Sequence, residues 1–95
     1  MRFVVSPRAQ ADLDDIWDYT VEQWGVRRAE IYARLIMAAV DAVAADPHVG
    51  RACDDVRPGY RKYPVGSHVL FYRVVDEEIV VVRILHRRMD VERRL

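Results

Sequence analysis

The stretch IVVVRILHRRMDVERRL, residues 79–95, decides the fold, because it begins as a strand that belongs inside a sheet and ends in charge. From Ile79 to Arg87 the residues are apolar on both faces for most of the length, which is typical of a strand in a central position. Cationic residues then crowd its end: His86, Arg87 and Arg88. The stretch therefore predicts a central strand whose end is a charged surface.

Alternation assigns the side chains of this strand to two faces. One face is apolar until its end and carries Val80, Val82, Ile84, His86 and Arg88. We expect this face to lie against helices. The other face has an arginine in mid-strand and carries Ile79, Val81, Arg83, Leu85 and Arg87. We expect that second face to be open or to be covered by another molecule.

The first half of the chain predicts two helices. Ser6 supplies an N-cap hydroxyl, and Pro7 fits the first helical position, where its missing N–H costs nothing. A stripe suited to core or hairpin packing follows at helical spacing: Leu13, Ile16, Trp17, Thr20, Val21 and Trp24. The acidic residues predict a solvated outer face: Asp12, Asp14, Asp15, Asp18 and Glu22. Gly25 ends this helix, and a second helix runs to Asp46, where Pro47 stops it.

Three strands follow the helices: Tyr60–Val65, His68–Val75 and Ile79–Arg87. Short turns join them, so they form an antiparallel meander. With a short first strand, Arg2–Val5, the order becomes β-α-α-β-β-β. We expect a single α+β domain over residues 1–95, in which an antiparallel two-helix hairpin packs on a small antiparallel sheet.

Charge and composition narrow the kinds of function. The 95 residues include 15 Lys or Arg and 15 Asp or Glu, and a net charge of zero excludes a generic polyanion binder. The charge is uneven, because residues 1–50 hold 5 Arg and 8 Asp or Glu, whereas residues 51–95 hold 10 Lys or Arg and 7 Asp or Glu. Cys53 is the only cysteine, so the chain can form no internal disulfide, which suits a protein of the reducing cytoplasm. No apolar run approaches 18 residues, so we expect no membrane contact.

We expect no cofactor, no metal and no catalytic residue. His48, His68 and His86 lie far apart and Cys53 has no paired partner, which is not the spacing of a zinc site. The four glycines are isolated at turns, so the sequence has no glycine-rich phosphate loop. Cys53 stands beside two aspartates, whose carboxylates disfavour a reactive thiolate.

The basic residues on the strands leave two interpretations open. Arg73 interrupts its strand as Arg83 does, and Arg61 and Lys62 lie on the strand before it. A sheet face with arginines among apolar residues is typical of a partner surface. Alternatively, Arg73 and Arg83 form structural ion pairs with acidic residues of this chain.

Four short motifs occur in a fixed order: Ala11-Asp12-Leu13 with Ile16, then Gly59-Tyr60-Arg61, then Tyr72-Arg73-Val74, then Ile84-Leu85-His86 with Arg88 and Asp90. In this order and spacing they resemble the ParE branch of the RelE/ParE toxin superfamily of bacterial toxin–antitoxin systems. The resemblance covers nearly the whole chain. It implies a helix hairpin packed on a small antiparallel sheet, the fold already expected from the residues.

The resemblance also implies a toxin that inhibits DNA gyrase and stalls replication. It implies a ParD-like antitoxin that folds onto the toxin in a heterodimer or heterotetramer, with DNA contacted only through the antitoxin. We expect the surface for antitoxin or gyrase to include Arg61, Lys62, Arg73, Arg83, His86, Arg87, Arg88, Met89 and Asp90. We further expect removal of Met89–Leu95 to weaken toxicity more than folding, because terminal segments usually contribute little core.

A rival branch, the RelE-type toxins, cuts mRNA on the ribosome. That reaction needs a base, an acid and cations, which the set Arg61, Tyr72, Arg83 and His86 would have to supply. The neutral net charge argues against ribosome binding, which a positive excess favours. Alternation also places His86 and Arg83 on opposite faces, unless a bulge intervenes. A third interpretation is a toxin that has lost its poison function and survives as a binding module.

Overall fold

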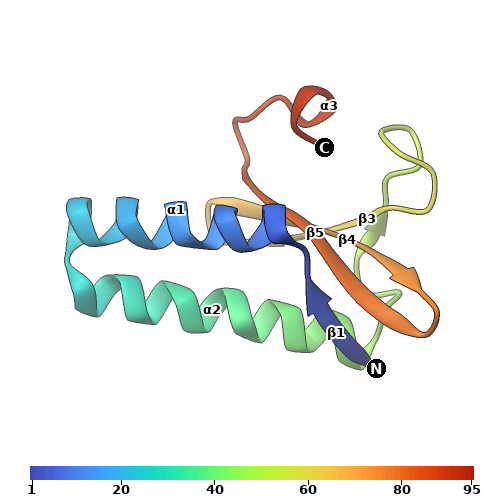
Figure 1. Ribbon diagram of the computed structural model, residues 1–95, viewed down its shortest axis with the longest axis horizontal. Coiled ribbons are helices and arrows are strands. Elements are labelled where there is room, and N and C mark those ends of the chain that lie inside the picture. Colours follow the sequence, from blue (N-terminus) through green and yellow to red (C-terminus); the bar gives the residue numbers. More distant parts are fainter.

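The helices and strands follow the predicted order in the computed structural model, which describes residues 1–95 (Figure 1). The elements are β1 (Arg2–Val5), α1 (Pro7–Trp24), α2 (Val26–Ala45), β2 (Arg51–Ala52), β3 (Arg61–Val65), β4 (His68–Val75), β5 (Glu78–His86) and α3 (Val91–Arg94). The α+β class and the helix hairpin are confirmed, whereas the sequence does not predict the short elements β2 and α3. None of the three helices combines the length and hydropathy that a membrane crossing requires.

The strands form one sheet of order β1-β5-β4-β3-β2, and the hairpin of α1 and α2 packs against it (Figure 1). β5 lies between β1 and β4, which confirms its central position. β4 pairs antiparallel with β3 and with β5, as a meander requires. β1 runs parallel to β5, so the sheet is mixed rather than wholly antiparallel.

Ser6 joins the first helix to the central strand. Its hydroxyl accepts a hydrogen bond from the Ala9 N–H at 3.1 Å, which is the predicted N-cap bond, and donates to the Val82 carbonyl at 2.9 Å. The Ser6 N–H donates to the carbonyl of Val81 at 3.0 Å. The residue that caps α1 therefore also fixes the start of the helix on β5. At the far end of α1, Gly25 alone connects the two helices, with a φ of 91° that glycine adopts readily.

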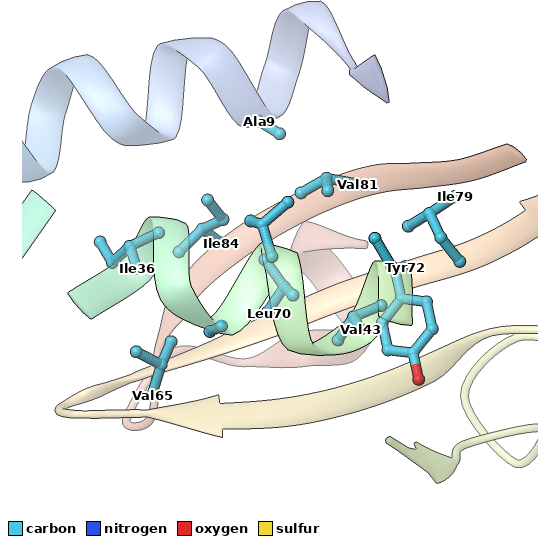
Figure 2. Close-up of a cluster of buried hydrophobic side chains, with 12 residues drawn as sticks. Ala9, Ile36, Val43, Val65, Leu70, Tyr72, Ile79, Val81 and Ile84 are labelled. Atoms are coloured by element: carbon cyan, nitrogen blue, oxygen red, sulfur yellow. The ribbon is translucent and has the colours of Figure 1, made fainter. Parts of the chain in front are cut away.

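A β-bulge at Val82 changes which side chains of β5 face the helices. Tyr72 of β4 pairs with Val81, but the preceding Phe71 pairs with Arg83, so Val82 is an extra residue in β5. Ile79, Val81 and Ile84 consequently all join the core beneath the helices (Figure 2). The expected faces are wrong for the first part of β5, because Ile79 and Val81, predicted on the open face, join the core, and Val82, predicted to face the helices, packs on the other side. Ile84 lies on the predicted face only because the bulge shifts the alternation by one residue before it.

The opposite face of the sheet is not open, because the end of the chain covers part of it. Cys53, Phe71, Leu85 and Leu95 form a second buried cluster, against which Val82 and other apolar residues pack. Leu95 is only 6% exposed. The premise that Met89–Leu95 contributes little core is therefore wrong, and removing this segment would uncover the second cluster.

Tyr72 ties the connection after α2 to the sheet. Its ring is buried in the main core, and its hydroxyl points out of the cluster (Figure 2). The hydroxyl donates to the carbonyl of Pro47 at 2.7 Å and accepts from the N–H of Gly50 at 3.0 Å. A β-carbon at Gly50 would lie 2.3 Å from the Tyr72 hydroxyl oxygen, so only glycine fits there. The Tyr72 side chain thus holds this loop in position and requires glycine at position 50.

Replacing Tyr72 with phenylalanine should lower the free energy of unfolding by about 1–3 kcal/mol, because the buried Gly50 N–H would lose its acceptor. Urea denaturation of the two proteins measures the difference. Tyr63→Phe is the matched control, since the Tyr63 hydroxyl makes no hydrogen bond within the chain, and it should change stability by less than about 0.5 kcal/mol. Equal losses in both variants would contradict the role given to the Tyr72 hydroxyl.

Candidate functional site: the cationic end of the sheet

Arg83 is engaged inside the domain. Its Nε and Nη2 donate to the two carboxylate oxygens of Asp12 at 2.7 and 2.8 Å, and its Nη1 donates to the carbonyl of Arg94. The Ile84 N–H donates to the same carboxylate at 2.9 Å. Hydrogen bonding to Asp12 raises the pKa of Arg83, although burial opposes the shift. Of the two interpretations of Arg83, the internal ion pair is confirmed. The expectation that Asp12 belongs to the solvated face of α1 is wrong, because its carboxylate is paired with Arg83.

Arg61, Lys62 and Arg73 lie on the two strands beyond β5. Half-buried Arg61 donates from Nη1 to the carbonyl of Gly50 at 2.6 Å, so it supports the same loop as Tyr72. Lys62 is half-buried beside it in β3. Arg73 is exposed, and its guanidinium lies 5.6 Å from the centre of the Tyr60 ring. Arg73 pairs with no carboxylate, so the ion-pair interpretation does not hold for this residue.

Arg87, Arg88, Met89 and Asp90 form an exposed turn after β5. The backbone holds this turn in place, because the Arg87 N–H donates to the Ser67 carbonyl at 3.0 Å and the Arg88 N–H donates to Nδ1 of His86 at 3.1 Å. Neither of these two arginines pairs with a carboxylate. Their guanidinium groups make one long hydrogen bond, 3.4 Å from Arg87 Nη1 to the carbonyl of Gly66. The two guanidinium groups are therefore free for a partner.

Two further residues, Tyr32 and His68, stand beside this turn, and the sequence does not predict them as part of the site. The rings of His68 and His86 meet edge to face with 5.3 Å between centroids. Tyr32 Oη lies 2.6 Å from His68 Nδ1 and accepts the Ser67 N–H at 3.0 Å. Burial lowers the pKa of His68, the neighbouring His86 lowers it further, and Asp12 opposes them. Burial also raises the pKa of Tyr32. This cluster favours a neutral imidazole at His68.

The residues that would have to build an RNA-cleaving site do not come together. Tyr72 is buried in the core, and Arg83 is bound to Asp12. Arg61 holds the carbonyl of Gly50. Of this set, only His86 borders the exposed turn. The bulge precedes both Arg83 and His86, so it does not change their placement on opposite faces of β5.

An apolar hollow of about 250 Å³ lies between the two helices of the hairpin. Leu13, Ile16 and Trp17 of α1 line it together with Ile36 and Met37 of α2. Trp17 remains 38% exposed at its rim.

Trp24, at the tip of the hairpin, is 67% exposed. The expectation that Trp24 packs into the hairpin is therefore wrong. The Arg28 guanidinium lies 5.8 Å from the centre of its ring.

Comparison with known proteins gives the family. Residues 3–91 match the family model described as ParE toxin of type II toxin-antitoxin system, parDE. The chain belongs to the ParE toxin family. It is 57% identical to Toxin ParE1 of Mycobacterium tuberculosis, with 99% of this chain and 97% of that protein aligned. It is 43% identical to Toxin ParE1 of Caulobacter vibrioides, with 96% and 94% aligned.

A solved structure agrees with the ParE assignment. The chromosomal ParDE TA system from P. aeruginosa contains a chain that superposes with a TM-score of 0.79 at 28% identity. The superposition covers 90% of this chain and 95% of that one. The sequence-based assignment to the ParE branch is confirmed, and the chain is a ParE toxin of a type II toxin–antitoxin system.

Replacing Asp12 with alanine should lower the free energy of unfolding by about 3–5 kcal/mol, because a buried guanidinium would lose its counter-charge. Thermal or urea denaturation measures the loss. Asp18→Ala removes an exposed carboxylate from the same helix and should cost less than about 0.5 kcal/mol. A loss in Asp12→Ala no larger than in this control would show that the pair does not hold the fold together.

Stability should fall as the pH drops below about 6.5, because His68 has a lower pKa in the folded chain than in the unfolded one. Below that pH the unfolded state binds more protons, so the contribution of His68 is present above pH 6.5 and lost as the pH falls through the folded pKa. Unfolding free energies measured between about pH 7.5 and about pH 5 should decline less steeply in His68→Gln than in the wild type. His48→Gln removes a histidine outside the cluster and serves as the control. Parallel profiles for wild type and His68→Gln would contradict the assignment.

Proposed function

We propose that this ParE toxin inhibits DNA gyrase, and hence replication, and that a ParD-like antitoxin neutralises it in the cytoplasm. The observation that carries the proposal is the match to the ParE family over residues 3–91, together with 57% identity to a protein named Toxin ParE1. The zero net charge supports a protein target over the ribosome, since RNA binding favours an excess of positive charge.

The proposed action is binding rather than catalysis. The dispersal of Arg61, Tyr72, Arg83 and His86 supports this interpretation, because general acid–base cleavage needs such groups within hydrogen-bond reach of one substrate. The toxin instead inhibits its target by binding to it through an exposed surface.

That surface includes the exposed turn after β5. Arg87, Arg88 and Met89 are exposed and unpaired. Exposed Arg73 pairs with Val80 in the sheet, at the other end of β4 from this turn, so it would contact a different part of a partner. Arginine binds carboxylates through two parallel hydrogen bonds, so these side chains suit an acidic segment of a partner. Arg83 does not belong to this surface, because its guanidinium is already paired with Asp12.

The ParD-like antitoxin covers the toxin with a segment that folds on binding. The exposed apolar residues around the helix hairpin, including Trp17 and Met37, give such a segment area to bury. Acidic residues in the same segment complement the free arginines of the turn. Neutralisation in this arrangement blocks the surface that gyrase would otherwise contact.

Expression of the chain without antitoxin in a bacterial host tests the proposal. Pulse labelling should show DNA synthesis failing before protein synthesis, and the purified chain should inhibit supercoiling by purified gyrase. Arg87→Glu with Arg88→Glu should weaken the inhibition at least about tenfold, because charge reversal repels the same acidic partner. Arg27→Glu with Arg34→Glu alters exposed arginines of α2 and should retain the activity of the wild type.

Other outcomes would identify other functions. Protein synthesis failing first, with mRNA cleaved in a translating extract, would replace gyrase with the ribosome as the target. Antitoxin binding without any growth arrest would indicate a chain that has kept only its binding role.

A further inference from the structure

Two hollows meet at the end of β5 and share Ser67 and His86. The first has no apolar residue in its lining, which consists of these two residues with Arg87 and Arg88. The second runs from them toward the tip of the helix hairpin, where Tyr19, Trp24 and Arg28 line it. No carboxylate lines either hollow. The joined surface thus places a cationic end beside an aromatic end.

The cationic end is built to donate hydrogen bonds to an anion. Arg87 and Arg88 have no carboxylate partner. Because His86 Nδ1 accepts the N–H of Arg88, the neutral imidazole carries its proton on Nε2, which makes that nitrogen a donor. The hydroxyl of Ser67 makes no hydrogen bond within the chain. The bond between the Arg87 N–H and the Ser67 carbonyl holds the turn in place before any ligand arrives.

The aromatic end has the features of a stacking surface. Trp24 is 67% exposed and Tyr19 is 63% exposed, although tryptophan is highly buried on average. Arg28 lies over the Trp24 ring and adds a cation beside it. Nucleic-acid bases stack on exposed aromatic rings of this kind, with cations nearby for the backbone.

We propose that this joined surface binds a nucleotide unit. The phosphate lies against Ser67, His86, Arg87 and Arg88, and the base stacks on Trp24 or Tyr19. The carboxylates of an acidic peptide would pair with the arginines but would not use the exposed Tyr19 and Trp24 rings, so the combination favours a ligand that carries both a phosphate and an aromatic base. The site requires neither gyrase nor antitoxin, and it relies on the local arginines of a surface without carboxylates rather than on the net charge of the chain. It departs from the expectation that DNA is contacted only through the antitoxin.

Fluorescence anisotropy of the purified full chain with a labelled single strand of about 12 nucleotides, at about 50 mM salt, tests the site. Arg87→Gln with Arg88→Gln should weaken binding at least about tenfold. It should also lower the slope of log affinity against log salt by about 0.7 for each phosphate that the protein no longer neutralises. Trp24→Ala or Tyr19→Ala should weaken binding about 5- to 150-fold, which corresponds to the loss of one stacked base. Arg27→Gln with Arg34→Gln, the matched control, should bind within about twofold of the wild type.

Competitors identify the source of the nucleotide. Displacement of the strand by a 5′-mononucleotide, but not by the matching nucleoside or by inorganic phosphate, supports a site that takes a free nucleotide. Displacement only by unlabelled single strand supports a site for a nucleic-acid backbone. The proposal is overturned if the strand does not bind, if the control pair loses as much affinity as the Arg87 and Arg88 pair, or if neither aromatic substitution changes binding.

Since no gyrase is present, this result is separate from the test of gyrase inhibition. Circular dichroism melting of each variant checks that it is folded. All the substituted residues are exposed, so their melting temperatures should stay close to that of the wild type.

Discussion

The two-pronged ion pair between Arg83 and Asp12 connects three parts of the chain that are far apart in sequence. It fixes α1 to the central strand, and the Arg83 Nη1 bond to the Arg94 carbonyl brings the last helical turn onto the same point. The Arg8 guanidinium donates to that carbonyl as well, at 2.8 Å. In a domain of 95 residues the apolar core leaves a small margin of stability, so a satisfied buried pair matters to the whole fold. An unpaired charge at this site would be far more costly than an apolar residue.

The arrangement also explains why the second face of the sheet needs the end of the chain. Once Arg94 is held by the two arginines, Leu95 follows into the cluster with Cys53, Phe71 and Leu85. Burial raises the pKa of the Cys53 thiol, and the aspartates beside it act in the same direction. The only cysteine is thus a packing residue with a disfavoured thiolate. The charged C-terminal segment, which the sequence suggests lies outside the core, therefore completes the second buried cluster through Leu95.

Much of the fold could be predicted because local signals agree with one another. Ser6, Pro7 and Gly25 set the limits of α1, and the apolar run of β5 places that strand inside the sheet. The bulge could not be predicted, because Val82 resembles its neighbours and nothing in its side chain marks an extra residue. Without the bulge, the Val75–Glu78 pairing would extend to place His68 opposite Leu85. With it, His68 faces His86, and the histidine cluster forms. The site was therefore only partly predictable: its arginines are visible in the sequence, but Tyr32 and His68 join them through register and packing.

The arginines on the sheet show why residue type alone does not assign a function. Arg83 and Arg61 look like surface cations in the sequence, yet each meets an acceptor of its own chain, a carboxylate for one and a backbone carbonyl for the other. Arg87 and Arg88 follow the last strand, where the chain turns away and offers them no carboxylate. A guanidinium with no carboxylate partner in the chain keeps most of its five donors for water or for a binding partner. The neutral total charge hides this difference, because the acidic residues that balance the free arginines lie elsewhere, many of them on the outer face of α1. What distinguishes the proposed binding end of the sheet is thus that no carboxylate of the chain pairs with its arginines, a property of the folded chain that its composition does not record.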